Sequence, residues 1–230
     1  MKVPVAAMPG LLGVIVSFAP CVSAIAESPE CVALKTTTIP FAYFSDMIST
    51  AENVSQPKRE IKTVVYRTGG LEHRFETINM ATGAVATKGF YLAPLLPRRF
   101  EFADGQQPTV ITYSSPPRGD WYSIKAIQYE STASKENGPK LLVSTGNIEV
   151  GAPEKMELSG CAFDVDAIHE AFVDKNPASG KVSVRTIEML YSPQLRIALA
   201  MTLRTKDDQG GSLFGQTLMT TRITADLSGR

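Results

Sequence analysis

The 230-residue chain lacks any concentrated positive charge. Its 23 basic and 23 acidic residues give a formal net charge of zero, and no basic run is longer than the pairs Lys58-Arg59 and Arg98-Arg99. Proteins that bind nucleic acid need a basic surface that displaces counterions from the phosphates. The sequence therefore argues against a nucleic-acid partner.

Residues that carry acid–base chemistry or bind metals are also scarce. The chain has two histidines, His73 and His169, and lacks the Gly-x-Ser-x-Gly segment that positions a serine nucleophile in many hydrolases. The histidines are not at a spacing typical of zinc ligands, and the run Asp207-Asp208 lacks the spaced oxygen ligands of a calcium loop. We therefore predict no catalytic residue, no metal site and no cofactor.

His169 has acidic residues close by in the sequence: Asp164, Asp166 and Glu170. In an extended strand, side chains two residues apart share a face, which places His169 opposite Asp164 and Asp166. Such a set does not converge on one point. We therefore favour a surface or packing role for His169.

Charge is almost absent from the first 26 residues, where Lys2 stands alone. An apolar stretch from Leu11 to Ala19 precedes Ala24-Ile25-Ala26, a pattern typical of a signal peptidase site. The stretch is too short to cross a bilayer as a helix. We expect residues 1–26 to be a signal peptide. Residues 27–230 would then form a single domain, periplasmic or secreted, with no transmembrane helix in the mature chain.

Only three cysteines are present, and cleavage after Ala26 would remove Cys21. The remaining two, Cys31 and Cys161, would then lie in an oxidising compartment, where an even number of cysteines is typical of disulfides. We predict a Cys31–Cys161 disulfide. The alternative is a pair of buried, unpaired thiols.

Long helical patterns are missing after the first 26 residues, and short alternating segments take their place. Ile197, Leu199, Met201 and Leu203 alternate with polar or small residues, a period of two that is typical of a half-buried strand. It belongs to residues 182–227, which are predicted to form three long strands ending in a hairpin, the last at 218–227. Further strands are predicted at 61–67, 71–80, 85–91, 98–102, 109–113 and 121–130, with turns rich in Gly, Pro and Asp between them. The sequence predicts a mainly β fold: a single antiparallel meander, either a curved half-barrel or a sandwich.

Two segments fit both a helix and a strand, and we favour the strand for each. Residues 41–51 carry a possible helical stripe, but strands are expected on every side. In residues 161–174, strict alternation puts Glu170 and Asp174 on a polar face together with Asp164 and Asp166.

Three segments are predicted to be irregular. Residues 27–40 are polar and interrupted by proline, and we expect an extended lead-in held by Cys31. Residues 92–99 contain Pro94 and Pro97, which cannot donate to a central ladder, and are predicted to be a loop or an edge crossing. Residues 131–140 are predicted to be a mobile polar loop.

Two short motifs give the chain a resemblance to a known group of proteins. Gly160-Cys161-Ala162-Phe163 has one residue more than a Gly-x-Phe strand segment, and Tyr191-Ser192-Pro193 fits a Tyr/Trp-x-Pro segment that opens the last long hairpin. On these residues the chain resembles periplasmic proteins of the unclosed β-barrel type, such as lipoprotein carriers and their uncharacterised relatives. The resemblance implies a half-barrel whose concave apolar face takes a hydrophobic ligand. It brings no catalytic residues.

Aromatic residues on successive predicted strands are the main candidates for a ligand site: Phe90, Phe100, Trp121 and Tyr129. In a closed sandwich these rings would be core, whereas in a half-barrel they would line an apolar pocket. Arg98-Arg99 near such a mouth would attract an anionic head group.

Three functions are compatible with these features, in decreasing order of preference. The first is a non-enzymatic periplasmic binding or carrier protein for an apolar or amphipathic molecule, such as a lipid-like ligand. The second is a structural or protein-interaction component of the cell envelope that has no small ligand. The third is a hydrolase-type enzyme whose acid–base residues are brought together only by the fold.

Overall fold

The computed structural model describes residues 27–36, 40–51, 54–67, 72–93, 95–114 and 126–225. These residues form one helix and thirteen strands. In chain order they are α1 (Pro29–Thr36), β1 (Phe41–Ala51), β2 (Val54–Ser55), β3 (Arg59–Arg67), β4 (His73–Ile78), β5 (Val85–Ala93), β6 (Leu96–Phe102), β7 (Thr109–Tyr113), β8 (Ala126–Lys135), β9 (Lys140–Leu158), β10 (Cys161–Lys175), β11 (Val182–Ser192), β12 (Ile197–Asp207) and β13 (Ser212–Ala225). The prediction of a mainly β fold is confirmed.

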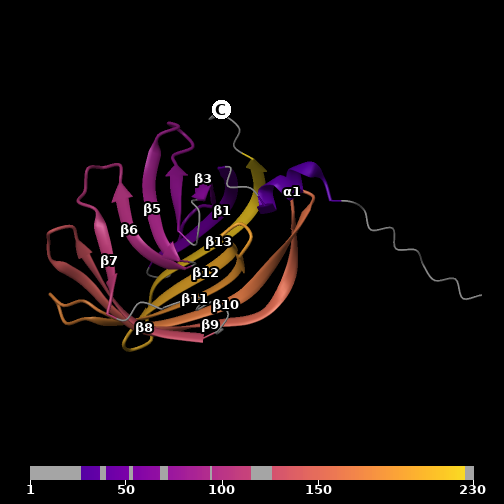
Figure 1. Cartoon of the computed structure of the whole chain (residues 1–230). Coiled ribbons are helices and arrows are strands. Elements are labelled where there is room, and N and C mark those ends of the chain that lie inside the picture. Colours follow the sequence, from indigo (N-terminus) through magenta and orange to yellow (C-terminus); the bar gives the residue numbers. More distant parts are fainter. Residues whose placement is uncertain are drawn as a thin grey trace, which may run out of the picture.

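The strands form one antiparallel meander that closes on itself (Figure 1). Neighbours in sequence pair with each other, except that β1 pairs with β3 and the short β2 adds to the end of β1. On its other side β1 pairs with β13, from Phe41 opposite Ala225 to Ala51 opposite Phe214. This last pairing turns the meander into a closed barrel with an inside and an outside. The sequence alone did not decide whether the sheet is closed.

Alternation along the strands sorts the side chains between the two faces. The predicted inward row of β12 is confirmed, because Ile197 and Leu199 are buried. The interior holds two clusters of buried apolar residues. One lies next to α1 and includes Leu34, Phe41, Val65, Phe163 and Leu199. The other lies farther along the long strands and includes Ile148, Val150, Ile168, Phe172, Ile187 and Met189.

The two ambiguous segments are strands, as favoured: residues 41–51 are β1 and residues 164–173 lie within β10. The predicted strand start at residues 121–125 and the expected signal peptide at residues 1–26 lie outside the described residues.

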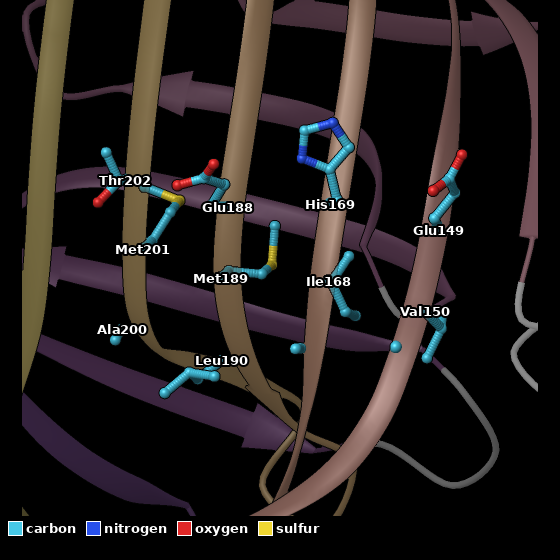
Figure 2. Close-up of a pocket in the computed structure, with 12 residues that line it drawn as sticks. Glu149, Val150, Ile168, His169, Glu188, Met189, Leu190, Ala200, Met201 and Thr202 are labelled. Atoms are coloured by element: carbon cyan, nitrogen blue, oxygen red, sulfur yellow. The ribbon is translucent and has the colours of Figure 1, made fainter.

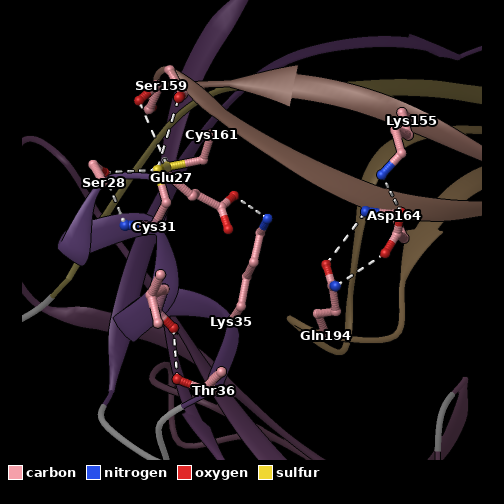
Figure 3. Close-up of polar contacts among 12 residues, drawn as sticks. Glu27, Ser28, Cys31, Lys35, Thr36, Lys155, Ser159, Cys161, Asp164 and Gln194 are labelled. Carbon is pink, nitrogen blue, oxygen red and sulfur yellow. Dashed lines mark hydrogen bonds and ion pairs between the residues drawn. A yellow bond between two sulfur atoms is a disulfide. The ribbon is translucent and has the colours of Figure 1, made fainter. Parts of the chain in front are cut away.

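The prediction of an extended segment over residues 27–40 is wrong, because α1 occupies its centre. Ser28 caps the helix, since its Oγ accepts a hydrogen bond from the backbone N–H of Cys31 at 3.2 Å (Figure 3). Pro29 is the first helical residue, a position where its missing N–H costs nothing. Lys35 in the last turn pairs with Glu27. Ser28-Pro29 is the helix signal that the sequence carried.

The other two segments predicted to be irregular are mostly strand. β5 reaches Ala93 and β6 begins at Leu96, and Pro97 is accommodated because the β5–β6 register shifts beside its partner Tyr91. β8 and β9 leave only residues 136–139 as a turn within the predicted loop 131–140. The polar residues Ser131, Thr132 and Ser134 are held in the sheet by pairing with β9.

The predicted Cys31–Cys161 disulfide is present and joins α1 to the start of β10 (Figure 3). Arg67 of β3 holds the other side of the helix, because its Nη1 donates to the backbone oxygens of Leu34 at 2.9 Å and Gln194 at 3.0 Å. Its guanidinium also lies over the ring of Phe41, 5.0 Å from the centroid. The helix is thus fixed to one end of the barrel.

Replacing Cys31 and Cys161 together by serine should lower the free energy of unfolding. The bond closes a segment with a sequence separation of 130 residues. For a loop of that length the chain-entropy model gives about 4–5 kcal/mol. Urea unfolding measures the change. A reductant should bring the wild type to the level of the double variant and leave the variant unaffected; an unchanged wild-type midpoint after reduction would contradict the prediction.

Candidate functional site: the lining of the barrel interior

A β-bulge in β9 lies beside the point where the buried positions of β10 change phase. Asp166 pairs with Pro153 and Ile168 pairs with Val150, so Gly151 and Ala152 of β9 together lie opposite Ala167. Val165 is buried before the bulge and Ile168 is buried after it. The inward-facing positions of β10 therefore change from odd to even residue numbers.

The prediction that Glu170 and Asp174 share a polar face with Asp164 is therefore wrong. Glu170 is 5% exposed and Asp174 is 4% exposed, and both face the interior. His169 is exposed on the outer face opposite Glu188, whereas Asp166 is the cross-strand neighbour of the buried Tyr191. The buried positions in the second half of β10 are out of phase with those in the first half.

Tyr129 of β8 and Phe172 of β10 meet over Gly146 of β9, which is the cross-strand neighbour of both. Their ring centroids are 5.4 Å apart. A Cβ on Gly146 would lie 2.4 Å from Cδ1 of Phe172, so only glycine lets this ring rest against the strand. Tyr113 of β7 extends the group, with its ring 5.3 Å from that of Tyr129. Its hydroxyl donates to the backbone oxygen of Pro97 at 2.7 Å.

A second aromatic group lies on β4, β5 and β6, and it too is built around a glycine. Gly89 separates Phe75 from Phe100, and a Cβ on Gly89 would lie 2.3 Å from Cζ of Phe75. Tyr91 contacts both rings, with centroid distances of 5.6 Å to Phe75 and 6.3 Å to Phe100. His73 stacks on Tyr91 at 4.8 Å.

Charged residues lie beside the first aromatic group. Arg185 of β11 donates to both carboxylate oxygens of Asp174, from Nε at 2.8 Å and from Nη2 at 3.3 Å. The guanidinium also lies 4.6 Å from the centroid of the Phe172 ring. Glu170, on the same strand as Asp174, makes no hydrogen bond or ion pair with any described residue.

The environment of Glu170 is apolar across the strands, where Ile148 and Ile187 are its partners. Burial raises the pKa of its carboxyl from the ordinary value of 4.5 to about 7, and the positive charge of Arg185 opposes part of this rise. Burial likewise raises the pKa values of Tyr113 and Tyr129, which remain neutral phenols. A carboxyl with such a pKa changes its charge near neutral pH.

Two of the four predicted ligand residues line this interior and one does not. Phe100 and Tyr129 face inward, as described above. Phe90 is opposite Arg99, on the face away from Gly89, so its ring lies on the outer surface of the barrel. Trp121 lies outside the described residues.

The arginine pair proposed to attract an anion does not provide a free cation at the interior. Arg99 contacts Glu101 at 2.9 Å and also pairs with Glu136. Arg98 is exposed at the point where the β5–β6 register shifts.

Phe172, Glu170, Asp174 and Arg185 were missed as site residues. The signal that would have found them is a change of phase: Val165 and Ile168, both apolar, cannot share a face in an unbroken strand.

A separate groove of about 740 Å³ lies on the outer surface of β9, β10, β11 and β12 (Figure 2). The floor of the groove is the backbone of a cross-strand row whose side chains point to the interior: Val150, Ile168, Met189 and Met201. One wall is the cross-strand row Glu149, His169, Glu188 and Thr202. The ionisable members of this row are exposed to water, unlike Glu170 on the inner side of the same sheet.

Among the described residues, no cluster of three or more His, Cys, Asp or Glu side chains suits a metal ion. Among the same residues, no helix is both long and apolar enough to cross a bilayer.

No protein-family model and no curated protein matches this chain. Solved structures with a similar fold do exist. An inferred lipoprotein from Parabacteroides distasonis is 9% identical, with a TM-score of 0.46, over 83% of this chain and 98% of the other. The hypothetical lipoprotein YmcC from Escherichia coli is 8% identical, with a TM-score of 0.40, over 77% and 86% of the two chains.

A LolA superfamily protein from Nitrosomonas europaea is 7% identical, with a TM-score of 0.33, over 84% of this chain and 88% of the other. These neighbours belong to the group of lipoprotein-carrier-like proteins that the sequence was expected to resemble. At this level of similarity they carry no information on a ligand or an activity.

Changing Gly146 to alanine should destabilise the protein by about 1–3 kcal/mol, because the added methyl group overpacks the wall between β8 and β10. The new Cβ would lie 2.1 Å from the backbone oxygen of Ala171. Gly215→Ala is the control, since its nearest atom outside the chain neighbours, Cβ of Thr50, is 3.8 Å away. Urea unfolding should show a loss for Gly146→Ala alone; equal effects of the two changes would refute the packing argument.

The raised pKa of Glu170 should make stability depend on pH. The folded protein holds this proton more tightly than the unfolded chain, so ionisation opposes folding and stability falls as pH rises from 4.5 to about 7. Relative to Glu170→Gln, the wild type should lose about 3 kcal/mol between about pH 5 and about pH 8. Chemical unfolding at the two pH values measures this. Glu188→Gln, on the outer face, should keep the wild-type profile, and a parallel profile for Glu170→Gln would contradict the prediction.

Proposed function

We propose that this chain is a non-enzymatic binding or carrier protein of the cell envelope, and that it takes an apolar or amphipathic ligand into the barrel interior. The observation that carries the proposal is that many inward-facing apolar side chains keep solvent-accessible surface, although they point into a closed barrel. They are Phe75, Phe100, Tyr113, Ile127, Tyr129, Met201, Leu203 and Leu218.

Accessible apolar surface on a concave wall favours the binding of an apolar ligand, because the ligand displaces water from that surface. The lining is also chemically divided. Aromatic and aliphatic side chains make most of it, whereas Glu170, Asp174 and Arg185 form one charged group. A molecule with an apolar part and a polar part fits such a wall better than a purely apolar one.

The proposal places the protein in the periplasm or outside the cell. This location rests on the expected signal peptide over residues 1–26 and on the Cys31–Cys161 disulfide, which requires an oxidising compartment to persist.

The fluorescent probe N-phenylnaphthylamine should bind the purified protein with a rise in emission, because the dye emits strongly only in an apolar environment. Leu203→Gln places an amide in the interior lining and should weaken binding about tenfold, which corresponds to about 1.4 kcal/mol. Thr202→Gln puts the same side chain on the outer face of the same strand and is the matched control. Fluorescence titration measures both affinities, and circular dichroism verifies that each variant is folded.

Two results would overturn this proposal. One is the absence of probe binding by the wild type. The other is an equal loss of binding in the Leu203 and Thr202 variants, which would place the probe outside the barrel interior.

A further inference from the structure

The barrel interior contains a buried carboxyl group that makes no hydrogen bond with any described residue. Glu170 is 5% exposed, and its cross-strand neighbours are the apolar side chains of Ile148 and Ile187. It makes no hydrogen bond or ion pair within the described ranges. Burying a carboxyl in this way is unfavourable, so its position calls for a ligand group that satisfies it.

The charges around Glu170 compensate its negative charge only in part, because the positive charge of Arg185 is shared with Asp174. The single cation of the charged group, Arg185, is held by Asp174 through two hydrogen bonds to its carboxylate. That pair is neutral as a unit. When Glu170 ionises, the interior site therefore has a net negative charge, which repels an anionic head group and attracts a cationic one.

The aromatic rings beside Glu170 add a second attraction for a cation. Tyr113, Tyr129 and Phe172 form a continuous group, with centroid distances of 5.3 Å and 5.4 Å. The faces of such rings are electron-rich and bind ammonium groups. The group already holds one cation in this way, because the guanidinium of Arg185 lies 4.6 Å from the centroid of Phe172.

We propose that the ligand of the interior site is a cationic amphiphile: an alkylamine head group pairs with Glu170 beside Tyr129, and its apolar chain lies along the aliphatic lining that includes Ile187 and Leu203. The inference rests on the function proposed above and names the chemical class of the ligand. An ammonium group donates hydrogen bonds to the carboxylate of Glu170, which accepts none from the described residues.

The test is displacement of N-phenylnaphthylamine by three molecules that share one alkyl chain and differ in their head group: dodecylamine, dodecanol and dodecanoate. All are used below the concentrations at which they form micelles. With the wild type, dodecylamine should displace the probe at a concentration at least about tenfold lower than either of the others, as one ion pair in a buried site would give.

Two variants test whether Glu170 causes the preference for dodecylamine. Glu170→Gln keeps the shape of the side chain and removes its charge, so the preference for dodecylamine should disappear while dodecanol still displaces the probe. Glu188→Gln removes a carboxylate from the outer face of the neighbouring strand and should keep the wild-type order.

The outcomes separate the two proposals. If the three molecules compete equally, or if dodecanoate is best, the interior still binds amphiphiles and the cationic assignment is overturned. If the amine preference survives in Glu170→Gln, the head group lies elsewhere and the assignment is again overturned. If the wild type does not bind the probe and none of the three molecules binds, both proposals fail.

Discussion

Hydrogen bonding between β1 and β13 is the constraint on which the rest of the structure depends. The two strands come from opposite ends of the described chain, and their pairing converts a meander with two free edges into a barrel with an interior. The neighbouring contacts support this seam. The backbone N–H of Ile223 in β13 donates to Oγ of Ser159 at 3.0 Å, and the disulfide fixes α1 to the strand that begins at Cys161. The closure therefore defines which side chains can meet a ligand.

The interior that results combines two opposing demands on stability. Apolar rows pack into two clusters and stabilise the barrel, whereas Glu170 lies among them with a pKa of about 7. A fold under selection for stability alone gains by replacing such a carboxyl with an uncharged side chain. The presence of Glu170 beside the neutral Arg185–Asp174 pair is explained if the residue at this position serves ligand binding and not packing.

The features that depend on local pattern were predictable from the sequence. Alternation found β12, and the cysteine count found the disulfide. Features set by distant contacts were not: the register between β1 and β13 joins segments far apart in the chain, and no local signal specifies it. The irregular pairing of β9 and β10 beside Ala167 is an intermediate case. Its phase change is visible between Val165 and Ile168, but strict alternation conceals it and places Glu170 on the wrong face.

The two interior glycines explain how a barrel lined with large rings keeps room for a ligand. At Gly89 and Gly146 a neighbouring aromatic ring occupies the space where a Cβ would stand, so Phe75 and Phe172 lie against the backbone of the next strand. A side chain at either glycine would push the ring off the strand and toward the axis. The same two positions hold Phe100 and Tyr129 in contact with these rings from the other side. Glycine in the wall therefore keeps these rings against the sheet, where they are available to cover an apolar chain.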